Sequence, residues 1–333
     1  MRTKTTRLRL ALAALLALAL ALGVSACGSS DDDTTGADTT ASEGGGAGGA
    51  IVTNPENEGV TLTVGSKNFT EQIVLGEVYA QALEAAGYKV KKDLNLGSET
   101  VARKTLKAGQ ISGYPEYVST ALTSFFGAEP EEVPADATEA YEEAKAEFEK
   151  EDLTAFPPTP FASANAVGLL KKTAEEKNLK TISDLEGVSE ELTLYGSPEC
   201  RQRIDCLAGL EELYGLKFKK FTPVDIGLRY TVLDNGQADL SILFTTDPQL
   251  AAQKDKYVIL EDDKQVFPAG NVIWVTTPKV VEDAGPDYEK TILEVQEGLT
   301  LPVVQELGAR VELEKEPAAK VAGEYLEAAG YTG

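Results

Sequence analysis

The chain has 333 residues, and its 54 acidic residues outnumber its 31 basic ones, so its formal net charge is −23. A surface this acidic repels phosphates, and the sequence holds no basic cluster, which excludes nucleic acid as a partner. The chain also lacks histidine, the commonest general base and metal ligand. Because it has no Gly-x-Ser-x-Gly elbow and no phosphate loop either, the sequence indicates no enzyme, no metal site and no cofactor.

The first 26 residues have the pattern of an export signal. Four basic residues precede an apolar run from Leu10 to Leu22, which is shorter than the roughly 20 residues that a membrane-spanning helix needs. Val24-Ser25-Ala26-Cys27 resembles a bacterial lipobox, in which the cysteine is lipidated and becomes the first residue. This resemblance implies a lipid anchor on Cys27 at the outer face of the cytoplasmic membrane. Cleavage there leaves 27 basic and 54 acidic residues, a net charge of −27.

We expect residues 27 to 58 to form a flexible tether after the anchor. They consist mainly of Asp, Thr, Gly, Ser and Ala without apolar periodicity, a composition typical of random coils. Gly44, Gly46 and Gly49 match a dinucleotide-binding pattern, but no strand precedes them and no helix follows, so we do not interpret them as such a site. Roughly 275 residues then remain, enough for two domains of ordinary size.

The first ordered elements alternate between strand and helix. We expect a strand from Thr61 to Ser66, a helix from Asn68 to Gly87 with Asn68 as its N-cap, a strand over 88–96 and a helix over 98–108. This order predicts a parallel sheet, followed by an acidic helix over 136–151. Lys67 lies in the turn after the first strand, where open α/β sheets bind ligands; a solvated surface lysine is the alternative.

One pattern occurs twice in the chain. Leu106 begins LKAGQISGYPEYVST and Leu233 begins LDNGQADLSILFTTD, and each predicts a helix that ends at a glycine, followed by a short strand. Tyr117 and Phe244 each lie 11 residues after the leading leucine. We therefore expect the two aromatic residues at equivalent strand ends, facing each other across a cleft; a chance recurrence of a common helix terminus is the alternative.

The middle of the chain predicts a second lobe inserted into the first. Pro157 to Phe161 mark a boundary, and strands and helices alternate again until Phe267-Pro268. A strand from Asn271 to Thr277 then returns to the first lobe, and we expect three more helices, the last ending at Gly330. Residues 59–160 and 271–333 thus form one lobe and residues 161–270 the other, an arrangement typical of a hinged clamp.

Two cysteines remain besides Cys27. Cys200 and Cys206 close a short loop that contains Arg203, and exported chains oxidise such pairs. A disulfide here stabilises the fold by roughly 2 kcal/mol on the chain-entropy model. Two free thiols are the alternative interpretation.

Four segments resemble one known family. VGSKNFTEQIVLGE, GYPEYVST, PECRQRID and FTTD, the last followed by LEDDKQVFP, have the order and spacing of the substrate-binding proteins of osmoprotectant ABC importers, which bind glycine betaine, choline or proline betaine. The resemblance implies an α/β, two-lobed periplasmic-binding-protein fold of type II. It implies that each lobe has a mainly parallel sheet flanked by helices, and that two hinge crossings join the lobes. It also implies a monomer that delivers its ligand to a permease driven by an ATPase.

The resemblance assigns site residues one by one. Betaine-binding members hold the carboxylate with a lysine, a threonine and an arginine, which match Lys67, Thr120 and Arg203 here. They enclose the trimethylammonium group in a cage of tyrosines; Tyr117 matches one of these, and Phe244 replaces another while keeping the aromatic ring.

Two departures leave this cage incomplete. Asn165 and Gly270 fall at or near positions where cage-bearing members have tyrosine. If each ring contributes roughly 0.5 to 2 kcal/mol, the loss of two weakens binding by about 1 to 4 kcal/mol. Glycine betaine is the expected ligand, with choline, proline betaine and carnitine as alternatives. A non-quaternary zwitterion or an amino acid, which Asn165 suits better, and a sensory lipoprotein that signals to a partner are the rival hypotheses.

Overall fold

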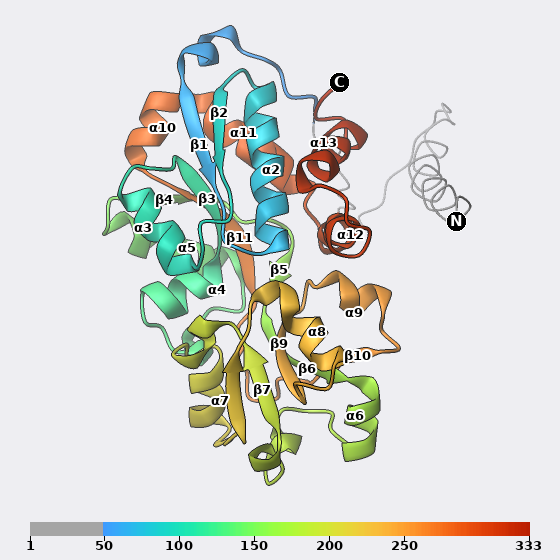
Figure 1. Cartoon of the computed structure of the whole chain (residues 1–333). Coiled ribbons are helices and arrows are strands. Elements are labelled where there is room, and N and C mark those ends of the chain that lie inside the picture. Colours follow the sequence, from blue (N-terminus) through green and yellow to red (C-terminus); the bar gives the residue numbers. More distant parts are fainter. Residues whose placement is uncertain (1–48) are drawn as a thin grey trace, which may run out of the picture. The chain divides into compact units, whose positions relative to one another are not determined.

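The computed structural model describes residues 49–333 (Figure 1). The predicted export signal, Cys27 and most of the predicted tether lie outside these residues. Within 49–333, no helix combines the length and the apolar character needed to cross a membrane.

The first lobe is built on a six-stranded sheet in the order β2-β1-β3-β11-β4, in which β5 also pairs with β11. Strands β1, β2 and β3 are parallel to one another, and β11 is antiparallel to β3, β4 and β5. The strands span Thr61–Gly65 (β1), Lys89–Asp93 (β2), Gly113–Tyr117 (β3), Thr154–Phe156 (β4), Ala162–Ser163 (β5) and Gly270–Thr276 (β11).

Helices cover this sheet and largely follow the predicted bounds. They span Thr70–Ala85 (α2), Glu99–Lys107 (α3), Val118–Thr120 (α4), Ala137–Glu149 (α5), Pro278–Ala284 (α10), Pro286–Glu297 (α11), Leu301–Glu312 (α12) and Ala318–Ala328 (α13). Asn68 is not the N-cap of α2, as we had predicted; its amide donates to the Gly97 carbonyl, and Phe69 is the cap.

Four helices rather than three follow β11 within the described residues. The first two are short and divided at Gly285, whose φ of 75° ends α10. Pro286 then begins α11, because its fixed φ suits a first helical position.

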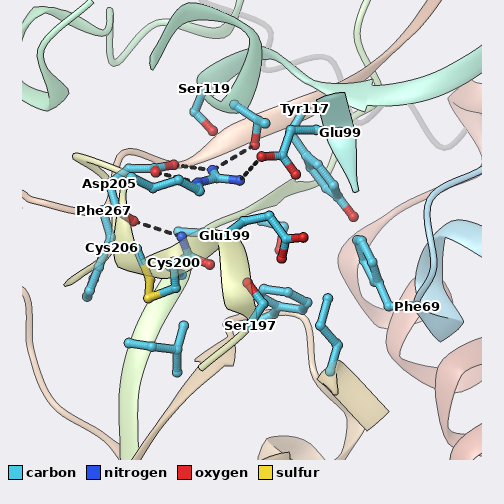
Figure 2. Close-up of a pocket in the computed structure, with 18 of the residues that line it drawn as sticks. Phe69, Glu99, Tyr117, Ser119, Ser197, Glu199, Cys200, Asp205, Cys206 and Phe267 are labelled. Atoms are coloured by element: carbon cyan, nitrogen blue, oxygen red, sulfur yellow. Dashed lines mark hydrogen bonds and ion pairs between the residues drawn. A yellow bond between two sulfur atoms is a disulfide. The ribbon is translucent and has the colours of Figure 1, made fainter. Parts of the chain in front are cut away.

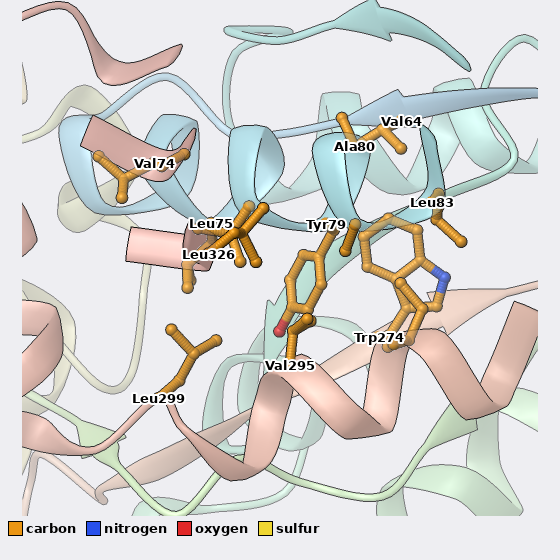
Figure 3. Packing of buried hydrophobic residues seen from close by; sticks show 14 of the residues in the cluster. Val64, Val74, Leu75, Tyr79, Ala80, Leu83, Trp274, Val295, Leu299 and Leu326 are labelled. Atoms are coloured by element: carbon orange, nitrogen blue, oxygen red, sulfur yellow. The ribbon is translucent and has the colours of Figure 1, made fainter. Parts of the chain in front are cut away.

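The core of the first lobe has two halves, one on each face of the sheet. Successive strand residues point to opposite faces, so Val272 and Trp274 of β11 enter one cluster while Ile273 and Val275 enter the other. Figure 3 shows Trp274 beside Tyr79 of α2, with a ring-centroid distance of 5.0 Å. The Trp274 indole also donates to the Tyr288 hydroxyl at 2.7 Å. This packing fixes β11, and therefore its neighbour β3, which ends at Tyr117.

The second lobe has a five-stranded sheet in the order β10-β6-β9-β7-β8. Strands β7, β8 and β9 are parallel, and β6 is antiparallel to β9 and β10. Each sheet thus has one reversed strand among those described, which confirms the mainly parallel α/β fold. The elements span Asn165–Leu170 (β6), Thr193–Gly196 (β7), Lys220–Pro223 (β8), Leu240–Phe244 (β9), Tyr257–Ile259 (β10), Lys171–Lys177 (α6), Leu207–Leu213 (α7), Arg229–Asp234 (α8) and Pro248–Ala252 (α9).

Two short segments join the sheets. The chain leaves the first sheet at Ser163 in β5 and enters the second at Asn165 in β6, and it returns to the first sheet at Gly270 in β11. The two lobes are therefore connected at two neighbouring points, which is the connectivity of a hinge.

The repeated Leu-x-x-Gly-Gln pattern has the predicted structure in both copies. Gly109 and Gly236 follow α3 and α8 with φ values of 68° and 66°, a left-handed conformation that glycine adopts without strain. Strands β3 and β9 then end at Tyr117 and Phe244. The two lobes therefore present equivalent strand ends.

The predicted end of the tether at residue 58 is wrong. Ile51 donates its amide to the Tyr331 carbonyl at 2.9 Å, and Pro55–Gly59 form a 3-10 helix. The buried Asn57 side chain donates to the Ala86 carbonyl at 2.9 Å. Because backbone amides and a polar side chain make these contacts, the segment shows no apolar periodicity in the sequence.

Candidate ligand-binding site

A pocket of about 850 Å³, continuous with solvent, lies between the two lobes. The carboxyl ends of β1, β3, β7 and β9 contribute to its walls, as expected for ligand sites of α/β sheets. All six residues predicted to bind ligand line it: Lys67, Tyr117, Thr120, Asn165, Arg203 and Phe244.

Arg203 links the two lobes across this pocket, and its partners Glu99 and Asp205 are labelled in Figure 2. Its Nε donates to Asp205 Oδ1 at 2.7 Å and its Nη2 contacts the other oxygen of the same carboxylate. Toward the first lobe, Nη1 lies 3.4 Å from Glu99 Oε1, and Nη2 lies 3.4 Å from Thr120 Oγ1. Burial alone would lower the pKa of Arg203, but the carboxylates of Asp205, Glu99 and Glu116 raise it overall. The guanidinium is therefore a permanent cation.

A disulfide between Cys200 and Cys206 confirms the predicted pairing and closes the loop that carries Arg203. Both cysteines are buried. The Asn165 side chain also donates to the backbone carbonyl of Asp205 at 2.8 Å. The loop is thus attached to β6 as well as closed on itself, so the direction of Arg203 is fixed.

Lys67 is buried in the turn after β1 and pairs with Glu116, which is fully buried. Its Nζ also lies 4.4 Å from the centroid of the Tyr117 ring. Glu116 Oε1 accepts the Tyr117 amide as well, at 2.8 Å. The charge of Lys67 is therefore balanced by a protein carboxylate, so a ligand carboxylate here would be its second partner.

Three aromatic rings of the pocket contact one another through Phe69. It is stacked on Tyr117 at a centroid distance of 6.3 Å and tilted by 51° against Phe244 at 5.2 Å. Phe69 falls inside the helix predicted from the sequence and is not among the predicted ligand-binding residues. Its position two residues after Lys67, in the same turn, was the feature of the sequence that indicated a place in the site. Tyr117 and Phe244 both line the pocket, and Phe69 contacts both of their rings.

Arg229 is a second cation that the sequence prediction missed. It is buried at the start of α8, its Nη2 lies 2.9 Å from Asp247 Oδ1, and its Nε donates to the Ile226 carbonyl at 2.7 Å. Its Cζ is 4.0 Å from the Phe244 centroid. Arg229 precedes Leu233 of the repeat by four residues, one helical turn, and this spacing was the only sequence signal for it.

Further carboxyl groups surround the rings. Glu71 accepts a hydrogen bond from the Tyr117 hydroxyl, and burial raises the pKa of Glu71. Burial, followed by the nearby Glu71, also raises the pKa of Tyr117. Glu99 and Glu199 line the pocket itself. The site therefore combines cations, carboxylates and hydroxyl groups rather than a cationic end and an aromatic end.

Gly270, at the other departure from the cage, is buried against Ser119 at the start of β11. A Cβ at this position would lie 2.3 Å from Ser119 Oγ and 2.7 Å from Ser119 N. No side chain fits here without movement of the backbone, so the position cannot carry a ring.

Two hinged α/β lobes that enclose a polar pocket at the ends of their strands define a two-lobed solute-binding protein. Residues 60–328 match the family model described as the substrate-binding domain of the ABC-type glycine betaine transport system, and the chain belongs to this family. It is thus the substrate-binding component of an ABC importer, a class that works outside the cytoplasm.

Individual relatives agree with this assignment. A glycine-betaine-binding protein of Pseudomonas aeruginosa is 34% identical over 80% of this chain and 87% of that protein. The carnitine transport binding protein OpuCC of Listeria monocytogenes is 28% identical over 81% of this chain and 87% of that protein. Among solved structures, a glycine betaine/carnitine/choline ABC transporter has 27% identity and a TM-score of 0.63, covering 82% of this chain and 99% of that chain.

Proposed function

We propose that this chain captures a small zwitterion bearing a carboxylate and delivers it to the permease and ATPase of an ABC importer. The observation that carries the proposal is the convergence on one interlobe pocket of all six residues that the sequence assigns to ligand binding. Glycine betaine is the first ligand to test, because related proteins are named for betaine and carnitine binding. No enzymatic step forms part of the proposal.

The geometry supports capture by closure of the lobes. Thr120 belongs to the first lobe and Arg203 to the second, and their side chains are 3.4 Å apart. A ligand carboxylate that accepts hydrogen bonds from both side chains would contact both lobes at once. Such a ligand binds the closed arrangement more tightly than the open one and shifts the population toward it.

Attachment to the membrane is also part of the proposal. The segment Val24-Ser25-Ala26-Cys27 supports lipidation of Cys27 at the outer face of the cytoplasmic membrane. A monomer anchored there can reach a permease in the same membrane. Mass spectrometry of the mature N-terminus tests this step: a diacylated Cys27 is expected, and an unmodified chain that keeps residues 1–26 would contradict it.

Calorimetric titration of the mature chain tests the ligand class. The panel is glycine betaine, choline, proline betaine, carnitine and ectoine. We expect the carboxylate-bearing compounds to bind more tightly than choline, because choline offers no carboxylate to Arg203. A panel without heat of binding at millimolar concentration would refute the ligand class and leave the fold unaffected, whereas tighter binding of choline would show that Arg203 is not the anchor.

A further inference from the structure

We infer that Glu199 accepts N–H···O hydrogen bonds from the cationic group of the ligand, so the preferred ligand is a zwitterion whose ammonium keeps at least one N–H. This inference rests on the proposed function, since it concerns the same pocket. The inference narrows the ligand class of the proposed function, because it excludes quaternary ammonium compounds, which have no N–H to donate, as the preferred ligand.

The arrangement of the rings argues against a quaternary ammonium. Phe69 contacts both other rings, with centroid distances of 6.3 Å to Tyr117 and 5.2 Å to Phe244. Protein cations already lie against two of these rings: Lys67 Nζ is 4.4 Å from the Tyr117 centroid, and Arg229 Cζ is 4.0 Å from the Phe244 centroid. A trimethylammonium group needs several π faces around one space, whereas these rings contact one another and two protein cations.

The two other cage positions cannot supply the missing rings. Asn165 donates to the Asp205 carbonyl at 2.8 Å and so holds the disulfide-closed loop. Gly270 leaves no space for a Cβ beside Ser119. Aromatic recognition of a cation is thus absent from both places, and the ligand cation must find another partner.

Among the carboxylates that line the pocket, Glu199 is the one left to pair with the cationic group of the ligand. Glu99 and Asp205 both contact the Arg203 guanidinium, whereas Glu199 forms no ion pair within residues 49–333. It is half-buried in the 3-10 turn Pro198–Arg201, which the disulfide holds at Cys200. Figure 2 shows its side chain extending into the pocket.

The charge balance of the pocket points the same way. Each lining cation has its own carboxylate partner: Glu116 for Lys67, Asp205 for Arg203 and Asp247 for Arg229. Glu99 and Glu199 are then in excess, so the pocket has a surplus of negative charge. This surplus attracts the ammonium end of a zwitterion, and an ammonium that donates an N–H to a carboxylate gains a charge-assisted bond that a methyl group cannot form.

A methylation series tests the inference by calorimetric titration: glycine, sarcosine, N,N-dimethylglycine and glycine betaine share one carboxylate and differ only in their N-methyl groups. N,N-dimethylglycine and glycine betaine are the decisive pair, because a single methyl replaces the last N–H. A charge-assisted hydrogen bond corresponds to roughly ten- to a hundredfold in affinity. We expect N,N-dimethylglycine to bind at least about tenfold more tightly than glycine betaine.

Variants locate the effect at Glu199. Glu199→Gln should reduce the preference for N,N-dimethylglycine over glycine betaine to less than about threefold. The conservative Glu199→Asp should keep most of this preference. Glu212→Gln is the matched control, because Glu212 is exposed on α7 and does not line the pocket. Thermal unfolding of each variant confirms that it is folded before titration.

The outcomes separate the two proposals. If wild type binds glycine betaine most tightly of the series, the inference is overturned and the proposed function stands. If no member of the series and no compound of the wider panel binds, the proposed function itself fails. If the preference for N,N-dimethylglycine persists in Glu199→Gln, the role of Glu199 is overturned.

Discussion

Arg203 and Glu99 form an ion pair between the lobes, with Nη1 of the arginine 3.4 Å from Oε1 of the glutamate. Arg203 comes from the disulfide-closed loop of the second lobe, and Glu99 from the first turn of α3 in the first lobe. A ligand carboxylate that approaches Arg203 therefore meets a protein carboxylate already in contact with it. Ligand binding and lobe closure thus depend on the same guanidinium.

Arg203→Ala should weaken the binding of a carboxylate-bearing ligand by about 2 to 5 kcal/mol. The variant removes the cation that the ligand carboxylate would pair with, and it leaves Asp205 and Glu99 facing each other without it. Calorimetric titration with the tightest ligand of the panel measures the change.

Arg201→Ala is the control for this change. Arg201 lies in the same loop but is exposed and stacks on Phe221, with Cζ 5.0 Å from the ring centroid. Its loss should leave affinity within about threefold of wild type, as expected of a surface residue. A loss of less than tenfold in Arg203→Ala would show that Arg203 has a structural role instead.

The double variant Cys200→Ser, Cys206→Ser should unfold at lower urea concentration, with a loss of roughly 2 kcal/mol in the free energy of unfolding. The disulfide limits the freedom of the unfolded chain over a sequence separation of 6 residues. Reducing agent should destabilise wild type by the same amount and leave the double variant unchanged. Equal stability of oxidised wild type and the double variant would contradict the prediction.

The strand ends of the site were predictable from the sequence because their signals are local. A glycine just after a helix commonly adopts positive φ, as Gly109 and Gly236 do, so both helix ends, and with them the strands that end at Tyr117 and Phe244, could be placed from the sequence. The predicted placement of these two rings in one pocket is confirmed.

The partners of the charged residues were not predictable. Glu116 and Asp247 neutralise Lys67 and Arg229 only because sheet pairing and α8 bring them together. Among 54 acidic residues no spacing distinguishes them. The place of Phe69 was not predictable either. The helix was expected to begin at Asn68, whereas α2 begins at Thr70 and leaves the Phe69 ring in the pocket.

Glu71 should make stability depend on pH above about 4.5. Burial raises its pKa above the ordinary value of 4.5, although hydrogen bonds from Thr246 and Tyr117 oppose the shift. The folded state therefore binds more protons than the unfolded state above pH 4.5, and the free energy of unfolding falls as pH rises through this window. Glu71→Gln removes this titrating group. The free energy of unfolding of the variant, relative to that of wild type, should therefore increase as pH rises.

Urea unfolding at a series of pH values measures this difference. Glu84→Gln is the control, because Glu84 is exposed on the same helix α2. A stability difference between Glu71→Gln and wild type that stays constant with pH would show that Glu71 titrates alike in both states.

Gly270→Ala should destabilise the fold by about 1 to 3 kcal/mol, the usual range for overpacking. The new Cβ would lie 2.7 Å from the backbone nitrogen of Ser119, and this backbone atom cannot rotate away. The chain must then shift at the point where it returns from the second lobe, which also displaces the neighbouring Thr120 from Arg203. Ligand affinity should fall together with stability.

Gly227→Ala separates this effect from the general effect of replacing a glycine. Gly227 is exposed, and a Cβ there meets nothing within 4 Å, so its stability should remain within about 0.5 kcal/mol of wild type. Urea unfolding and calorimetric titration of both variants make the comparison. Equal midpoints for the two variants would mean that the contact with Ser119 relaxes freely, and then the absence of a ring at position 270 would not be a steric requirement of this fold.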